Sequence, residues 1–187
     1  VVYIVEASYY ASSANILAPT SAKFKEWTGL KGKPVCMIQG AWYNKQLQQD
    51  YGMEAVAFKG TAEAMTALKS NNCVAFAYDD TLILATLLES EWKDYEMPLK
   101  SVLEDPWGLA VKLGEEKFYK FMSDMIVDWH RTGRIVELEK KYHSAVEHWS
   151  NHHFKDYPVL LEQWDKYFPT DEKFCLCAKM ELGTPEL

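Results

Sequence analysis

The chain has 187 residues, of which 48% are hydrophobic and 25% are charged. This composition is typical of a globular protein and excludes disordered and fibrous classes. A formal net charge of -7 argues against a nucleic-acid partner, because such a partner requires lysine and arginine side chains clustered on one face. The most apolar run, Leu82 to Leu88, is far shorter than the roughly 20 residues that cross a bilayer, so we expect no membrane helix.

Predicted strands and helices alternate along the first part of the chain. We expect strands at 14–19, 33–40, 54–60 and 73–80, and helices at 41–52, 61–72 and 81–92. A strand at 107–113 follows, and then come helices at 115–132, 134–142 and 158–168. Alternation of this kind predicts an α/β fold with parallel strands and right-handed crossovers.

One strand-to-helix junction, MIQGAWYNKQL at 37–47, is a candidate anion site. Gly40 permits a sharp turn, and a helix that starts directly after it would present free backbone N–H groups and the positive end of its dipole. Many such junctions bind nothing, so this motif alone does not define a function.

Three strings, in this order, resemble one protein family. They are LKGKPVCMIQG at 30–40, AVAFKGTAEAMTALKSNNCVAFAYDD at 55–80, and DPWGLAVKLGEEKFYKFMSDMIVDWHRTGRIVELEKKY at 105–142. Over about residues 9–142 the chain resembles the extracellular amino-acid-binding proteins of ABC importers, family 3 of the periplasmic solute-binding proteins. The resemblance implies a type II periplasmic-binding-protein fold, with one doubly wound parallel-sheet lobe, part of a second lobe, and a ligand clasped between lobes.

The same resemblance divides the chain. Residues 20–106 would form the second lobe, residues 1–19 and 107–142 would form parts of the first lobe, and residues 143–187 would be an extension of unknown role. The opening half of the first lobe, which in the family holds an aromatic platform and a carboxylate-binding arginine, has no counterpart here. Arg131 and Arg134 flank the turn between two predicted helices and cannot replace that arginine. We therefore expect either a fragment or a chain whose missing part another chain supplies.

The resemblance assigns ligand binding to the junction described above. Gln39, Gly40, Ala41 and Trp42 occupy the position where the family holds the ligand α-carboxylate with backbone N–H groups and threonine hydroxyls. Neither hydroxyl is present here, so we expect the backbone N–H groups of Ala41 and Trp42 to remain as donors. Trp42 either stacks on a ligand or packs against its own lobe. Its size favours a larger, aromatic or differently charged ligand over a standard amino acid.

Asp79 and Asp80 end the predicted strand at 73–80, where the family places an acid that binds the ligand α-ammonium. Successive side chains alternate across a strand end, so we expect one of the two to face the ligand. We expect Asp79 to do so and Asp80 to cap the following helix, with the reverse assignment left open. Tyr78 and Tyr43 are further candidates, although core packing alone would also explain them.

Four cysteines are present. Cys36 and Cys73 lie in predicted strands that are neighbours in a 2-1-3 strand order, which brings their Cα atoms within disulfide range if the register agrees. Some members of the family carry a cysteine pair at matching places. A disulfide would indicate an oxidising compartment, and two buried free thiols are the alternative. Cys175 and Cys177 form a C-x-C motif that is too close for an easy mutual disulfide and lacks a second pair at zinc-finger spacing.

The sequence gives little support for catalysis, cofactor binding or metal binding. Motifs for a nucleophile elbow, a P-loop or a dinucleotide site are absent, so we expect neither catalysis nor a cofactor. Because no H-E-x-x-H motif is present either, we interpret the histidine cluster as a solvated face and expect no metal. The cluster consists of His143, His148, His152 and His153.

These observations predict a binding protein that delivers a small polar solute, an amino acid or a related metabolite, to the membrane permease of an ABC transporter. The resemblance implies a periplasmic or extracellular location. The opening residues carry no basic region or cleavage site, so we expect that any export signal has been removed or was never part of this sequence. Two alternatives use the same scaffold. One is the periplasmic sensor module of a signalling receptor, and the other is a dehydratase-like enzyme.

Overall fold

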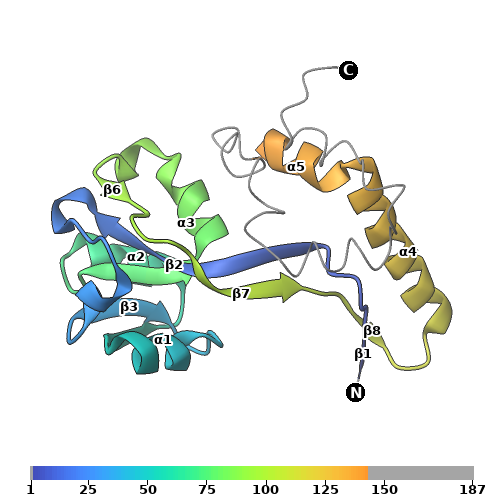
Figure 1. Cartoon of the computed structure of the whole chain (residues 1–187), viewed down its shortest axis with the longest axis horizontal. Helices are drawn as coiled ribbons and strands as arrows, with labels where there is room; N and C mark the ends of the chain where they lie inside the picture. The colour runs from blue at the N-terminus through green and yellow to red at the C-terminus, as the bar shows by residue number, and fades with distance from the viewer. Residues whose placement is uncertain (1, 143–187) are drawn as a thin grey trace. The chain divides into compact units, whose positions relative to one another are not determined.

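A computed structural model describes residues 2–142 (Figure 1). Their contacts define two units: Ser12–Glu104 forms unit 2, and residues 2–11 together with 105–142 form unit 1. The predicted helix at 158–168, the clustered histidines and the C-x-C motif lie outside the described residues. Between residues 2 and 142, no helix is both long enough and apolar enough to cross a membrane.

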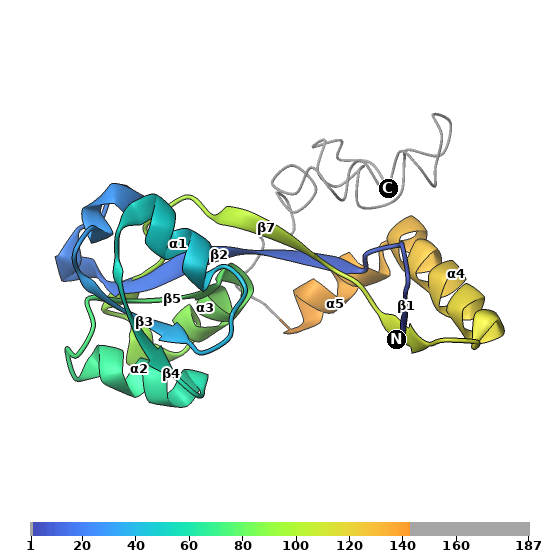
Figure 2. The same ribbon diagram turned by 90° about the horizontal axis from the view of Figure 1, so that it is seen from below.

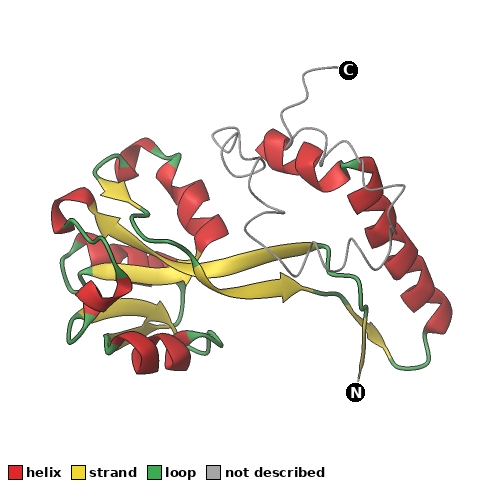
Figure 3. Ribbon diagram, viewed as in Figure 1, coloured by secondary structure: helices red, strands yellow, loops and turns green. Residues whose placement is uncertain are grey.

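Unit 2 is built on a mixed sheet in which three neighbouring strands are parallel (Figure 3). Its strands are β2 (Tyr10–Pro19), β3 (Pro34–Ile38), β4 (Glu54–Phe58), β5 (Ala75–Asp79), β6 (Tyr95–Glu96) and β7 (Val102–Trp107). The strand order is β4-β3-β5-β2-β6, and β7 also pairs with β2. β3 runs parallel to both β4 and β5, whereas β2 runs antiparallel to β5.

Helices cover both faces of this sheet. α1 (Asn44–Tyr51) lies on one face, and α2 (Thr61–Lys69) and α3 (Asp80–Leu87) lie on the other (Figure 2). Along β3, Val35 and Met37 pack on the α1 side, whereas Cys36 packs on the α2 side, as the two-residue period of a strand requires. Three short 3-10 helices complete the unit: η1 (Thr20–Ala22), η2 (Trp27–Leu30) and η3 (Ser90–Trp92).

Unit 1 contains a two-stranded antiparallel sheet and two helices. β1 (Val2–Ile4) pairs with β8 (Ala110–Lys112), and α4 (Glu116–Thr132) packs on one side of this pair. Gly133 has a left-handed φ of 73° and ends α4, as predicted, before α5 (Arg134–Tyr142) begins. The small core consists of Val5, Ala7, Val111 and Ile126, with tyrosine, methionine and tryptophan side chains around them.

The predicted order of elements is confirmed from β3 to α3 and from β8 (Ala110–Lys112) to α5, but β6 and β7 were not predicted as strands and several boundaries differ. β2 begins at Tyr10 and not at Ala14, because pairing and burial extend through alanines and serines that carry little hydrophobic signal. β1 was not predicted at all. α3 ends at Leu87, and a separate 3-10 turn replaces the predicted last turn of that helix.

The boundaries of the two units also differ from those expected from the resemblance. β2 and β7 are the strands along which the chain passes from one unit to the other. Residues 12–19 lie in unit 2, because this part of β2 pairs with β5 and β6. At the other end, unit 2 stops at Glu104 instead of residue 106.

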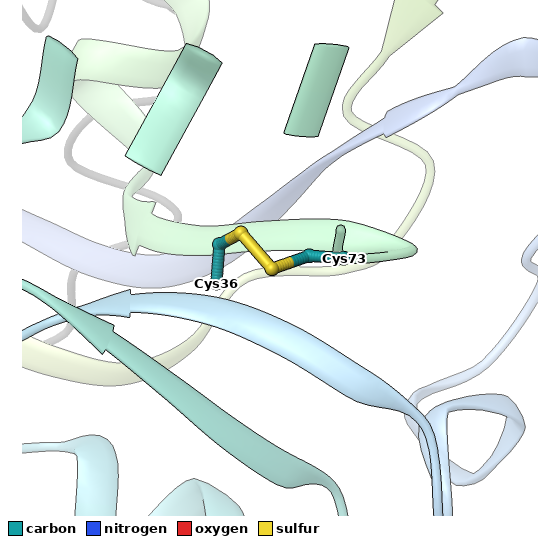
Figure 4. Close-up of a disulfide and its surroundings, with 2 residues drawn as sticks. All are labelled: Cys36 and Cys73. Atoms are coloured by element: carbon teal, nitrogen blue, oxygen red, sulfur yellow. A yellow bond between two sulfur atoms is a disulfide. The ribbon is translucent and has the colours of Figure 1, made fainter. Parts of the chain in front are cut away.

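Cys36 and Cys73 form a disulfide (Figure 4), as the resemblance implied. Cys36 lies in β3 and Cys73 lies shortly before β5, and their Cα atoms are 5.5 Å apart. Both side chains are buried in the core between the sheet and α2. The bond therefore cross-links two neighbouring parallel strands of unit 2.

Candidate functional site

The polar candidates of unit 2 lie at the edge of its sheet where the parallel strands β3 and β5 both end. The loop 39–43 follows β3, and Asp79 is the last residue of β5. In open α/β sheets, ligands bind beyond the carboxyl ends of the strands. This edge is therefore the candidate site.

The loop 39–43 begins with a tight turn. The Ala41 N–H donates to the Ile38 carbonyl at 3.2 Å, and Gly40 has a φ of 86°. This is the geometry of a type II turn, which favours glycine at its third position. The turn therefore already uses the Ala41 N–H, one of the two groups that we expect to serve an anion.

α1 starts later than the sequence predicted, at Asn44 and not at Ala41. Asn44 donates from Nδ2 to the Ile38 carbonyl at 2.7 Å, and its backbone N–H donates to the Ala41 carbonyl at 3.2 Å. These two bonds fold the loop back against the end of β3. The first N–H groups of the helix therefore belong to residues from 44 onward, and not to Ala41 and Trp42.

Trp42 and Tyr43 differ in burial. Tyr43 is buried in the core on the α1 side of the sheet, whereas Trp42 is 54% exposed. Their rings meet edge to face with centroids 5.6 Å apart, which is a favourable arrangement for aromatic rings. An exposed indole held in this way can stack on a flat or cationic group.

The Tyr43 hydroxyl connects the loop 39–43 to the end of β5. It donates to Asp79 Oδ1 at 2.9 Å. Hydrogen bonds to charged groups contribute about 1.5–3 kcal/mol, more than those between neutral groups, so this bond orients the carboxylate. It also joins the aromatic pair and a carboxylate into one polar and aromatic cluster at the carboxyl edge of the sheet.

Asp80 has a different environment from Asp79. It is 2% exposed, and its Oδ1 accepts a hydrogen bond from the Ser13 N–H of β2 at 3.1 Å. The N-cap position of α3 is occupied by Asp79, which makes no side-chain capping bond, and Asp80 is the first helical residue. The predicted capping role of Asp80 was therefore wrong. Its carboxylate ties α3 to β2, at a helix end where negative charge is favourable.

Tyr78 contributes to the core next to this cluster. Its ring stacks on Phe76, with centroids 5.5 Å apart and an interplanar angle of 13°. Partial burial, and secondly the Asp79 carboxylate, raise the pKa of the Tyr78 hydroxyl above its usual value. The hydroxyl therefore remains protonated at neutral pH and is able to donate a hydrogen bond.

Sequence reasoning missed two polar residues of β2. Ser13 donates its N–H to Asp80, and the fully buried Asn15 donates from Nδ2 to the Leu99 carbonyl and to Ser101 Oγ, both at 2.9 Å. For Asn15 the signal was present in YASSANILAP, where an asparagine interrupts an apolar strand, whereas Ser13 bonds through its backbone N–H and its residue type gives no signal. Because buried polar groups are normally hydrogen-bonded, such residues indicate anchors to neighbouring segments.

In the part of the chain that the structure describes, we find neither a metal site nor an arginine placed to bind a ligand carboxylate. No group of three or more histidine, cysteine, aspartate or glutamate side chains could hold a metal ion among residues 2–142. Arg131 pairs with Asp128 on α4, and Arg134 pairs with Glu137 on α5 at 3.0 Å. Each arginine thus has an acidic neighbour on its own helix.

The fold is that of type II periplasmic binding proteins, with a mixed α/β sheet that is partly parallel. The crystal structure of the P235GK mutant of ArgBP from T. maritima matches with a TM-score of 0.65 and 19% sequence identity. The match covers 76% of this chain and 62% of that chain. No family model matches the sequence.

Two curated bacterial proteins are similar in sequence. The chain is 27% identical over 136 residues to the ABC transporter glutamine-binding protein GlnH of Bacillus subtilis. The matched region makes up 72% of this chain and 49% of GlnH. It is 24% identical over 136 residues to the L-glutamate/L-aspartate-binding protein of Pseudomonas aeruginosa. This matched region makes up 68% of this chain and 44% of that protein. The chain is thus a homologue of bacterial amino-acid solute-binding proteins, which are not enzymes, and it spans about half the length of these relatives.

Proposed function

We propose that this chain contributes the binding lobe of a receptor for an amino acid or a related small polar solute. The receptor would act in the periplasm or outside the cell and deliver its ligand to the membrane permease of an ABC transporter. The observation that carries the proposal is the hydrogen bond between Tyr43 and Asp79. It brings an exposed aromatic loop and an oriented carboxylate together at the edge of the sheet where this fold class binds ligands. The names of the two relatives support the ligand class and the transporter.

The groups at this edge have different proposed roles. Asp79 binds the ligand ammonium group, because its carboxylate is oriented by Tyr43 and is less buried than that of Asp80. Trp42 stacks on the ligand side chain, and the turn at Gln39 and Gly40 fixes the position of the indole. Tyr78 and Asp80 support this arrangement from the core. Ala41 acts through its place in the turn.

The disulfide supports the proposed location. A cross-link between Cys36 and Cys73 is stable in oxidising compartments such as the periplasm or the extracellular space, and is rare in the cytosol. Its place within the sheet of unit 2 also supports a lobe that keeps its shape when ligand binds.

Titration of the isotope-labelled full chain with each of the twenty amino acids, followed by ¹H–¹⁵N spectra at millimolar concentrations, tests the proposal. We expect at least one amino acid to shift the amide signals of the loop 39–43 and of residues 78–80. Asp79→Asn should weaken that binding at least tenfold, because the ammonium group loses its counter-charge. Asp50→Asn, at an exposed position of α1, is the matched control and should leave affinity unchanged. If no amino acid shifts these signals, the proposal is wrong.

A further inference from the structure

The side chains at the candidate site carry more hydrogen-bond acceptors than donors. An ionised carboxylate such as that of Asp79 only accepts hydrogen bonds, and Asp80, which is 2% exposed, adds a second carboxylate at the next position. The hydroxyl of Tyr43 is a donor, and it binds Asp79 Oδ1. A ligand carboxylate at this edge would therefore meet charge of its own sign.

The backbone N–H groups of the turn after β3 make hydrogen bonds within unit 2. The Gln39 N–H donates to the Phe58 carbonyl at 2.8 Å, and the Ala41 N–H donates to the Ile38 carbonyl at 3.2 Å. The Asn44 N–H donates to the Ala41 carbonyl at 3.2 Å. Because each N–H group is a single donor, these three bonds take up amide groups that a bound carboxylate would need.

The side chain of Asn44 adds an acceptor to the same loop. Its Nδ2 donates to the Ile38 carbonyl at 2.7 Å, and since a carbonyl only accepts, this bond fixes the orientation of the amide. The Asn44 Oδ1 atom is buried, and no hydrogen-bond partner for it is found among residues 2–142. Buried polar atoms are normally paired, so a ligand N–H that reaches this oxygen would supply the missing donor.

The indole of Trp42 adds a surface that attracts cations. Trp42 is 54% exposed, and its ring meets the buried ring of Tyr43 edge to face at a centroid distance of 5.6 Å. The face of an aromatic ring is negative, and tryptophan attracts cations more strongly than the other aromatic side chains do. Tyr43 thus contacts both the indole and the Asp79 carboxylate.

We propose that this site selects an organic cation that carries N–H donors and no carboxylate, such as a primary amine or a guanidinium compound. The indole of Trp42, the carboxylate of Asp79 and the Oδ1 atom of Asn44 all favour positively charged N–H groups. An amino acid would bind through its ammonium group in the same way, but its carboxylate would find the Ala41 N–H already bonded. This ligand class rests on the proposed function, because it belongs to the same site.

Calorimetric titration of the full chain with amino acids and their decarboxylated amines tests this selection. Arginine and agmatine form one pair, phenylalanine and phenethylamine form another, and the members of each differ only in the α-carboxylate. We expect the amine of at least one pair to bind at least tenfold more tightly than its amino acid, because like-charge repulsion is absent. Trp42→Leu should weaken amine binding about fivefold, and Trp42→Phe should weaken it less. Leu88→Ala, at another exposed apolar position of unit 2, is the matched control and should leave affinity unchanged.

The possible results separate the ligand class from the proposed function. Amino acids that bind at the loop 39–43 as tightly as their amines in both pairs would overturn the ligand class and leave the proposed function intact. Loss of amino-acid binding alone in Lys59→Gln would also overturn it, because a lysine after β4 would then hold the carboxylate. Amine binding that Trp42→Leu and Asp79→Asn both leave unchanged would place the cation elsewhere and refute it too. Absence of binding by every amino acid and every amine would refute both proposals.

Discussion

The hydroxyl of Tyr43 makes a contact that its sequence position alone does not indicate. Tyr43 lies in the loop after β3, and its partner Asp79 lies at the end of β5, 36 positions away. The resemblance placed Asp79 near a ligand, whereas Tyr43 was a lesser candidate because core packing alone would also explain it. Tyr43 does both, since its ring is buried in the core while its hydroxyl orients a carboxylate.

Tyr43→Phe should therefore separate packing from hydrogen bonding. We expect the free energy of unfolding of unit 2 to fall by about 1–3 kcal/mol, because a bond to a charged acceptor is lost while the ring remains. Urea denaturation followed by tryptophan fluorescence measures this change. Tyr51→Phe is the control, because the Tyr51 ring stacks on Trp27 and no hydrogen bond of its hydroxyl to another described residue is found. An equal effect of both substitutions would contradict the assigned role.

His130 makes the stability of unit 1 depend on pH. Burial lowers the pKa of its imidazole, and the hydrogen bond between Nε2 and the Ser8 carbonyl, at 2.7 Å, opposes this only in part. Because the folded pKa is below the ordinary value of about 6.5, the unfolded chain binds a proton that the folded chain does not. The full contribution to stability is thus present above about pH 6.5 and is lost as the pH falls toward the folded pKa.

His130→Gln should remove this dependence, because glutamine can still donate to the Ser8 carbonyl but does not titrate. Hydrogen exchange of α4 amides at pH 5.0 and at pH 7.5, corrected for intrinsic exchange rates, measures it. We expect the wild-type chain to lose protection of α4 at the lower pH by more than the variant does. Equal losses in the two proteins would show that other groups cause the pH dependence.

At the scale of elements, the sequence predicted the sheet better than the loops. Continuous apolar runs identified β3 and β5, because parallel strands covered on both faces need such runs, whereas β4 lies at the edge of the sheet and is largely exposed. The start of α1 was not predictable from helical periodicity. A type II turn and the Asn44 side chain together occupy residues that periodicity assigned to the helix. Both hydrogen bonds depend on the position of the Ile38 carbonyl in the folded structure, which the periodicity of the sequence does not indicate.

The disulfide stabilises the elements that carry the candidate site. Cys36 and Cys73 are separated by 37 positions, and for a loop of this length the chain-entropy relation gives about 4 kcal/mol. We expect reduction of the wild-type chain to lower the free energy of unfolding by about 2–4 kcal/mol in urea. Cys36→Ala with Cys73→Ala should lose a similar amount and become insensitive to reductant. Cys175→Ser with Cys177→Ser is the control, which should still respond to reduction like the wild type.

At the scale of the whole molecule, the two units differ in the number of interactions that stabilise them. Unit 2 contains a sheet with cores on both faces and an internal disulfide, whereas unit 1 has a two-stranded sheet and one small core. The resemblance predicted a complete lobe at 20–106 with parts of another lobe on either side of it in the sequence, but it did not predict that most of β2 lies in unit 2. That assignment depends on pairing between β2 and β5, which are distant in sequence.

Unit 2 should therefore fold by itself. We expect a fragment of residues 12–104 to show a cooperative thermal transition by circular dichroism and to contain an oxidised Cys36–Cys73 pair. A fragment of residues 105–142 should remain unfolded under the same conditions, because it lacks β1 and has few core residues. A non-cooperative transition for residues 12–104 would mean that unit 2 depends on unit 1.

The burial of the disulfide has a consequence for the order of events during folding. Cys36 and Cys73 lie beneath α2 and are almost inaccessible in the finished sheet. A small oxidant or a thiol exchange partner must reach them before α2 closes over the strands, since exchange requires access to the sulfur atoms. A chain that completes folding in its reduced form would then keep two shielded thiols for as long as unit 2 stays closed. The redox history of a preparation, more than the buffer in which it is measured, therefore determines whether the cross-link is present.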